Sequence, residues 1–366
     1  MRLECWIVPI LLAEAGCARS GQPARPPSSL AKAAAYLWSQ QADDGGWHSH
    51  TYGLLRSGQS LTPFVLEALQ QVPEAQYPLP GAKVDRAIAF IRRNTQTSGA
   101  LGTADAGIPD YPNYSTALAV SAVCRARRGD WQAYIKPMVS YLRQQQFTEQ
   151  NGWRRPDPAY GAWGMGGDRR TPPDTGHVDL SMSRYVIEAL HAAGVPQADP
   201  AFACARVFVE RCQNFDPQHP DAADGGFFFS TTESDTNKAG HDGKRFRSYG
   251  TTTADGILAL LGTGPPGDPR VGAAQRWLTN HHRDMDVPGF SGEAYQRWPR
   301  GLAFYYASAS AQAFQMLGVD AGPGVVASLR RTQRPDGSWA NPENLVKEDD
   351  PLIATPLAVR ALVLSM

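Results

Sequence analysis

Two kinds of apolar stretch alternate along the chain, and together they predict pairs of helices. In the first kind, around residues 35–38, 88–91 and 138–142, apolar side chains recur at spacings of three and four, as on a helix with one buried face. In the second kind, such as residues 355–362, nearly every position is apolar or small, as on a helix that is covered on all sides. The alternation predicts amphipathic outer helices, each paired with a more apolar inner helix.

A glycine and an aromatic residue recur at the end of the first helix of each pair. The copies read QQADDGGW to Trp47, QQQFTEQNGW to Trp153, DGGF to Phe227, PGF to Phe290 and RPDGSW to Trp339, with a degraded copy around Gly99. Glycine can end a helix in the left-handed conformation that a side chain would penalise, and the aromatic ring can then fold back onto the helix pair. Six copies at a period of roughly 50 to 70 residues predict stacked repeats that bury each other's apolar faces.

The spacing of glutamine, glycine and tryptophan in these phrases resembles the QW repeats of squalene-hopene cyclases. The chain as a whole, over roughly residues 29–366, resembles the squalene-cyclase and protein-prenyltransferase α/α toroids. Longer phrases, such as DLSMSRYVIEAL from Asp179 and RSYGTTTADGILALL from Arg247, resemble bacterial prenyltransferase and squalene-oxidase repeat proteins. The resemblance implies an all-α (α/α)6 toroid of six helix-pair repeats, with about 12 helices. It implies less about activity, because this fold carries several chemistries.

Length, composition and charge are consistent with one toroid domain. Repeat folds grow by addition, so we expect residues 30–366 to form a single domain after a flexible linker over residues 18–29. The 35 basic residues balance the 35 acidic residues, which argues against a nucleic-acid partner. Many of the 35 Gly and 29 Pro lie in connecting loops such as residues 154–174, which are long enough to shape a mouth over the barrel.

Residues 1–17 differ from the rest of the chain and predict a signal peptide. Arg2 precedes an apolar stretch over residues 6–13, and a pair of small residues leads to Cys17, an order that resembles a bacterial lipoprotein signal. We therefore expect an exported protein, either periplasmic or anchored to a membrane through a lipid on Cys17. Glu14 departs from the usual pattern of such signals, and a frayed terminus or a misassigned start is the alternative.

The acid motif of squalene-type cyclases is incomplete in this sequence. That motif, Asp-x-Asp-Asp at the start of an inner helix, holds a protonated acid that donates to an alkene. Residues 179–182 read Asp-Leu-Ser-Met and keep only the first acid, so Asp179 is the candidate catalytic residue. Asp349 and Asp350 lie too far from the end of their inner helix and either bind a ligand or cap the helix before Pro351. Because a helix start favours a carboxylate over a carboxylic acid, we expect no cyclisation of squalene by protonation.

The zinc ligands of protein prenyltransferases are also incomplete. Such a site needs Asp, Cys and His after the Gly-Gly-Phe of a late repeat. The chain after Phe227 offers His241, Asp242 and Asp255 but no cysteine, so we expect no metal and no cofactor. The basic residues at 244–247 either bind a diphosphate or carboxylate or lie in a solvated loop.

Further residues at the starts of inner helices predict a lined cavity at one mouth of the barrel. Besides the aspartate pair at 349–350, the candidate ligand-binding residues are His177, Tyr249, Tyr305 and Tyr306. Aromatic walls with a few polar groups suit an apolar or carbohydrate-like ligand, and they can stabilise a cation. The structural alternative is that Asp179 caps a helix and that the tyrosines pack in the core.

The sequence leaves more than one class of function open. The first is a cyclase-like or prenyltransferase-like toroid whose cavity binds an apolar, isoprenoid-like small molecule and uses Asp179 as a divergent acid. The second is a non-catalytic toroid that binds a ligand or a protein at the rim formed by the long loops. The third is a polysaccharide-active (α/α)6 barrel, which requires paired carboxylates across a groove.

Overall fold

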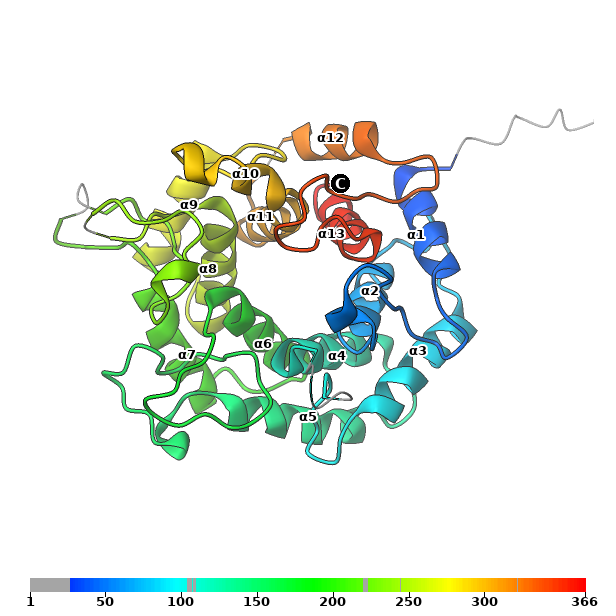
Figure 1. The fold of residues 1–366 in the computed structure, drawn as a ribbon, viewed down its shortest axis with the longest axis horizontal. Coiled ribbons are helices and arrows are strands. Elements are labelled where there is room, and N and C mark those ends of the chain that lie inside the picture. The colour runs from blue at the N-terminus through cyan, green and yellow to red at the C-terminus, as the bar shows by residue number, and fades with distance from the viewer. Residues whose placement is uncertain (1–26, 104–106, 108–109, 220–222, 244, 321) are drawn as a thin grey trace, which may run out of the picture.

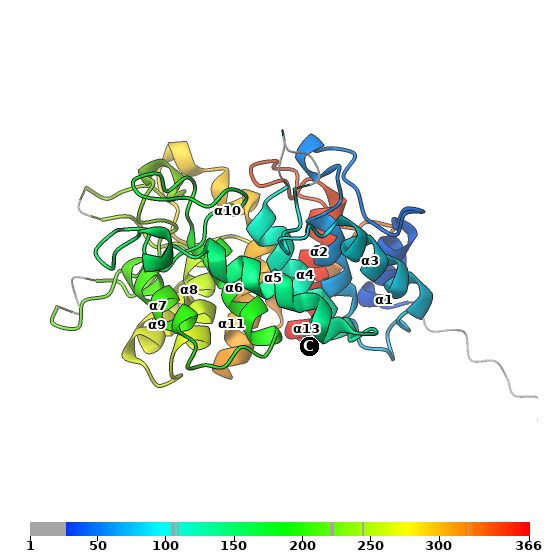
Figure 2. The same cartoon turned by 90° about the horizontal axis from the view of Figure 1, so that it is seen from below.

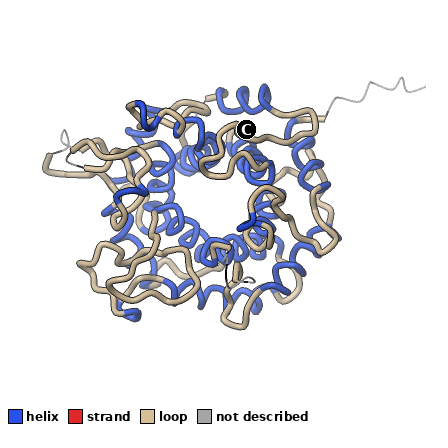
Figure 3. The backbone as a smooth tube through the Cα atoms, viewed as in Figure 1, coloured by secondary structure: helices blue, strands red, loops and turns tan. Residues whose placement is uncertain are grey.

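The computed structural model describes residues 27–366 except 104–106, 108–109, 220–222, 244 and 321. Thirteen α-helices and no strand occur among these residues, and the tube in Figure 3 is helix and loop. The expected all-α toroid is therefore confirmed, with one short helix beyond the six pairs. The expected signal peptide, with Cys17, lies outside the described residues. No described helix is long and apolar enough to span a membrane.

Six inner helices form a closed ring (Figure 1). They are α2 (Leu61–Leu69), α4 (Pro112–Ala126), α6 (Leu180–Ala192), α8 (Gly250–Thr263), α11 (Ala303–Leu317) and α13 (Pro351–Leu364). Each packs against the next along the chain, and α13 packs against α2. Because every inner helix is covered by two neighbours and by outer helices, all nine residues of α2 are buried.

Six outer helices surround this ring. They are α1 (Ser29–Ser39), α3 (Gly81–Asn94), α5 (Trp131–Gln145), α7 (Pro200–Arg211), α9 (Pro269–His281) and α12 (Gly324–Thr332). Each buries one face only, as α3 does with Val84, Ala87, Ile88 and Ile91 at spacings of three and four. The short helix α10 (Trp298–Gly301) lies in the loop before α11. In the side view of Figure 2, the long loops gather at the end of the ring opposite the C-terminus, where the inner helices begin.

The repeated glutamine–glycine–tryptophan phrase fastens outer helices to their neighbours, as its first copy shows. The Gln41 side-chain amide donates to the carbonyl of Gly45 at 3.0 Å and to that of Lys83, in the next outer helix, at 2.9 Å. The Trp47 indole N–H donates to the Leu37 carbonyl at 2.7 Å, and its backbone N–H donates to a threonine hydroxyl on α2 at 3.1 Å. Gly45 has a φ of 91°, and a Cβ there would lie 2.4 Å from a carbonyl oxygen of α3. The phrase therefore joins two outer helices and one inner helix.

The third copy of this phrase ends at Trp163. The sequence predicted an end at Trp153, which is wrong. The Trp163 indole donates to a carbonyl of α5 at 2.7 Å, and the Gln146 amide donates to the Gly161 carbonyl at 2.9 Å, as in the first copy. Trp153 is also buried, but it packs on Phe147 within a loop that is inserted between the glutamine and the glycine. The expected fifth copy is also modified, because Phe290 is only half-buried and packs against the Tyr249 ring.

Candidate functional site

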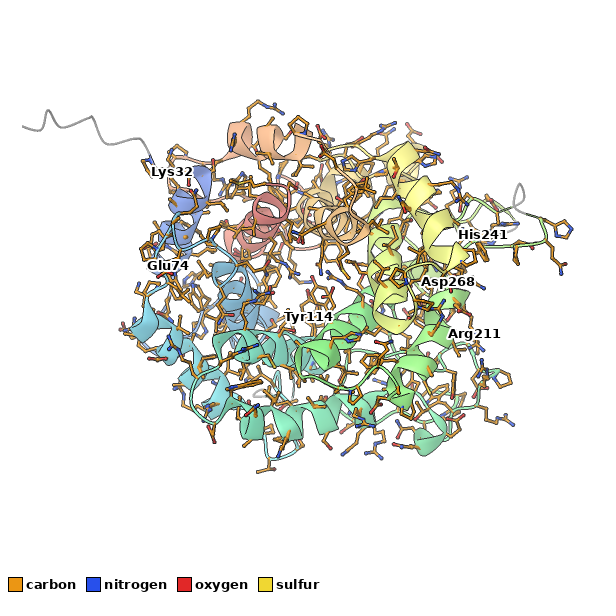
Figure 4. The ribbon with its side chains drawn as sticks, turned by 180° about the vertical axis from the view of Figure 1, so that it is seen from behind. Lys32, Glu74, Tyr114, Arg211, His241 and Asp268 are labelled. Atoms are coloured by element: carbon orange, nitrogen blue, oxygen red, sulfur yellow. The ribbon has the colours of Figure 1, made fainter. Side chains whose placement is uncertain are left out.

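A cavity of about 390 Å³ lies at the end of the ring where the inner helices begin. Every inner helix contributes to its wall from the first turns or from the residues just before them. These residues are Ser60, Leu61, Phe64, Tyr111, Tyr114, Asp179, Ser181, Met182, Tyr249, Thr251, Leu302, Tyr305, Ile353 and Leu357. Figure 4 shows one of them, Tyr114, extending from α4 toward the centre of the ring. The volume is within the range of small-molecule sites, about 300 to 1,000 Å³.

Loops complete the wall of the cavity above the helix ends. Their contribution comes from Leu55, Met165, His177, Phe229, Lys238 and the segment 345–348. Most of the wall is aliphatic or aromatic, so the cavity offers an apolar surface with a few polar groups at defined places. This composition is typical of sites for small apolar molecules.

Asp179, His177 and Glu233 form a hydrogen-bonded chain in the wall. One Asp179 oxygen caps α6 by accepting from the Met182 backbone N–H at 2.7 Å, and the other lies 2.8 Å from His177 Nε2. His177 Nδ1 lies 3.0 Å from a Glu233 oxygen. Burial by itself lowers the pKa of His177, but the two carboxylates outweigh burial and raise that pKa above its ordinary value. The two carboxylates therefore favour the protonated form of the imidazole.

Asp255 lies behind the cavity wall and accepts hydrogen bonds from the hydroxyl groups of two residues that line the cavity. The Ser181 hydroxyl donates to Asp255 at 2.5 Å, and the Tyr305 hydroxyl donates to the same carboxylate at 2.9 Å. Asp255 is fully buried, and burial raises its pKa to about 6, although Arg184 and the two hydroxyls act in the opposite direction. These contacts fix the direction of the Tyr305 ring in the cavity.

A network of charged and polar side chains connects inner helices across the ring. Arg184 pairs with Glu188 at 2.9 Å on α6, and Gln312 of α11 donates to the same glutamate at 2.9 Å. Arg360 of α13 pairs with Glu67 of α2 at 3.4 Å. Arg360 also donates to Gln312 at 3.3 Å, so the network joins four inner helices across the ring.

Glu348 and Lys238 are ionisable lining residues that the sequence did not single out. Glu348 accepts the backbone N–H groups of Phe304 and Tyr305 at 3.1 and 2.8 Å and so caps α11, and burial raises its pKa to about 7. Lys238 lies with its Nζ 3.5 Å from the centroid of the Phe229 ring, and burial lowers its pKa to about 8. Both residues lie in loops, where no sequence period indicates which side chains face the cavity.

The structure brings together four of the residues that the sequence proposed for the site. Asp179, His177, Tyr249 and Tyr305 all line the cavity. No cluster of three or more His, Cys, Asp or Glu side chains suited to a metal ion occurs in the described part of the chain.

Tyr306, Asp349 and Asp350 do not line the cavity. Tyr306 is turned by one helix position from Tyr305, so its hydroxyl lies 2.9 Å from a ring nitrogen of His282 on the outer side. Asp350 caps α13 by accepting from the Leu352 N–H at 2.9 Å, and Asp349 accepts from a tyrosine hydroxyl at 2.5 Å. The two acids therefore fasten the start of α13 to the loop before α2.

Comparison with known proteins shows the fold and no closer relationship. No family model matches the chain, and no curated protein matches its sequence. Among solved structures, the type II terpene cyclase MstE from Scytonema is similar with a TM-score of 0.59 and 15% identity, over 92% of this chain and 96% of that one. A protein from Actinoplanes is similar with a TM-score of 0.52 and 16% identity, over 92% and 97% of the two chains. A glycosidase is similar with a TM-score of 0.51 and 13% identity, over 91% and 96%.

Proposed function

We propose that the cavity binds an apolar, isoprenoid-like small molecule and that Asp179 and His177 form its polar anchor. The observation that carries this proposal is the composition of the wall, in which aliphatic and aromatic side chains from all six inner helices surround one hydrogen-bonded carboxylate–imidazole pair. The fold supports it as well, because structures of MstE include complexes with a substrate, geranylgeranyl dihydroxybenzoate, and with a product, merosterolic acid A.

The polar pair is suited to orient a ligand or to accept a proton from it. Both Asp179 oxygens accept hydrogen bonds, and the helix start adds further stabilisation of negative charge. Around the polar pair, the rings of Phe229, Tyr249 and Tyr305 can stabilise positive charge that develops on a bound ligand.

The proposal is tested by titrating the protein with geranylgeraniol and, separately, with a soluble xylo-oligosaccharide, with binding followed by calorimetry. We expect saturable binding of the isoprenoid alcohol and none of the sugar. Met165→Trp adds bulk to the cavity wall. Met316→Trp is the control, because the Met316 side chain is 53% exposed and does not line the cavity. Only the first variant should lose binding.

The same titration separates the alternatives. Binding and cleavage of the oligosaccharide would favour a polysaccharide-active barrel, for which the glycosidase provides a precedent in fold alone. If the folded protein binds neither probe, the result would favour the remaining alternative, a non-catalytic toroid that binds a protein at its rim.

A further inference from the structure

The amine of Lys238 lies in the cavity wall without a polar partner. Its Nζ lies 3.5 Å from the centroid of the Phe229 ring and 5.8 Å from that of the Trp298 ring. It forms no hydrogen bond and no ion pair with any described residue. A lysine that is directed at aromatic faces inside a cavity is therefore available to a ligand.

The loop around Lys238 is held in place by contacts of the residues on both sides of it. The neighbouring Asn237 is buried, accepts from the Phe229 backbone N–H at 2.7 Å and donates to the Ser230 carbonyl at 3.0 Å. Ala239, on the other side, is fully buried. These contacts fix the backbone of Lys238 beside the ring on which its amine lies.

The surroundings of Lys238 favour a neutral and therefore nucleophilic amine. Burial lowers the pKa of Lys238 to about 8, although Asp179 and Asp255 raise it. At pH 7 about a tenth of such amines are neutral, against fewer than about one in a thousand for an ordinary lysine. A lysine desolvated in this way is the kind that forms Schiff bases with carbonyl compounds.

We propose that Lys238 forms a Schiff base with an apolar aldehyde bound in the cavity, an inference that rests on the proposed function. The nitrogen lone pair attacks the carbonyl carbon, a C–N bond forms, and the oxygen takes up a proton to give a carbinolamine. The hydroxyl then leaves as water after a second protonation, and the nitrogen loses its remaining protons as the C=N bond forms. The exchange of carbonyl oxygen for nitrogen releases one water and needs no oxidant or reductant.

His177 is placed to supply the proton for the leaving hydroxyl. Its ring centroid lies 5.9 Å from that of Phe229, the ring that also contacts the Lys238 amine. Asp179 and Glu233 raise the pKa of His177 and so favour its protonated form, which places a proton donor and a nucleophile on either side of one aromatic wall. The apolar part of the aldehyde would occupy the remainder of the cavity.

The test uses farnesal as the aldehyde and sodium cyanoborohydride to trap the imine as a secondary amine. We expect intact mass spectrometry to show one farnesyl group per chain and peptide mapping to place it on Lys238. Labelling should increase with pH up to about 8, as the amine loses its proton. Lys238→Met, which keeps an apolar stem, should reduce labelling by about tenfold or more.

Lys136→Met is the control, because Lys136 is an exposed lysine on α5 that does not line the cavity. It should label as the wild type does. Equal labelling of Lys238→Met and wild type would overturn the Schiff base. Farnesol is titrated in parallel: binding of farnesol without an adduct from farnesal would overturn the Schiff base alone, whereas no binding of farnesol would contradict the proposed function.

Discussion

Gln333 and Ser29 are 304 positions apart in sequence, yet the Gln333 side-chain amide donates to the Ser29 carbonyl at 2.9 Å. The same amide donates to the Gly337 carbonyl at 2.9 Å. Gln41, Gln146 and Gln213 make the same pair of bonds from one outer helix to the next. In the last repeat this contact connects the end of α12 to the first outer helix, so it closes the outer ring.

We expect Gln333→Ala to lower the free energy of unfolding by about 1 to 3 kcal/mol, because two hydrogen bonds of about 0.5 to 1.5 kcal/mol each are lost. Urea unfolding followed by circular dichroism measures the change. Gln40→Ala is the control, since Gln40 is exposed and its amide bonds only to Ser39. If both variants unfold at the same urea concentration, the glutamine does not close the ring.

The buried tryptophans of the phrase are expected to be structural. Trp47, Trp163 and Trp339 are all fully buried, and each indole donates to a carbonyl of the preceding outer helix. Replacement of any one by alanine should lower the free energy of unfolding by roughly 3 to 5 kcal/mol. Trp153→Ala should cost a comparable amount through loss of packing. Retained stability of these variants with loss of ligand binding would indicate a role in the site.

The ring could be predicted from the sequence because its causes are local and repeated. Helix periodicity distinguishes inner from outer helices. Glycine is needed in the turn after an outer helix, where φ is positive and the backbone touches the next outer helix, as at Gly45. The prediction failed at the third copy, where a loop with its own glycine and tryptophan is inserted. Trp153 directly follows Gly152, whereas Trp163 lies two positions after Gly161, the spacing of the first copy, and its contact with α5 shows that it belongs to the repeat.

The cavity was predicted in part. Asp179, Tyr249 and Tyr305 lie at or near helix starts, and the closure of the ring brings such positions together. Lys238 and Glu348 were missed because loop residues follow no period, and their positions depend on contacts such as that of Asn237 with the Phe229 backbone. Tyr306 was expected in the cavity, yet a single helix position turns it outward.

The buried Asp255 should make stability depend on pH. Burial raises its pKa from 3.8 to about 6, so the folded state binds the proton more tightly than the unfolded state. The wild type therefore loses stability as the pH rises from about 4 to 6, by about 3 kcal/mol at most, and the loss is complete above that range.

Asp255→Asn should remove this dependence and keep partners for the Ser181 and Tyr305 hydroxyls. Urea unfolding at pH 4, 5, 6 and 7 measures the difference between variant and wild type, which we expect to grow in favour of the variant over this range. Asp43→Asn, at an exposed position, should follow the wild type. A constant difference at all four pH values would show that Asp255 is already ionised at pH 4.

Export and lipid attachment remain predictions from the sequence. We expect Cys17→Ala to leave the precursor uncleaved or to release the protein from the membrane fraction of a bacterial host. Fractionation followed by intact mass spectrometry measures both outcomes. If wild type and variant are both full-length proteins of the soluble cytoplasmic fraction, the lipoprotein signal is wrong.

Two aspartates that cap inner helices have different surroundings and should respond differently to substitution. Asp179 caps α6 and lines the cavity, whereas Asp350 caps α13 and does not line it. Asparagine is as good a helix cap as aspartate, so Asp179→Asn and Asp350→Asn should both lower stability by less than about 1 kcal/mol. Only Asp179→Asn removes the charge beside His177, and we expect that variant alone to bind geranylgeraniol about tenfold more weakly, as expected for loss of a buried charged anchor.

The same pair of variants decides whether Asp179 donates a proton to an alkene. In the structure both of its oxygens already serve as hydrogen-bond acceptors, one for the Met182 backbone N–H and one for His177 Nε2. We therefore expect no cyclic product when the wild type is incubated with squalene or shorter polyprenyl substrates and the extract is analysed by mass spectrometry. Cyclic product from the wild type and from Asp350→Asn, but not from Asp179→Asn, would show that Asp179 is a proton donor despite these contacts.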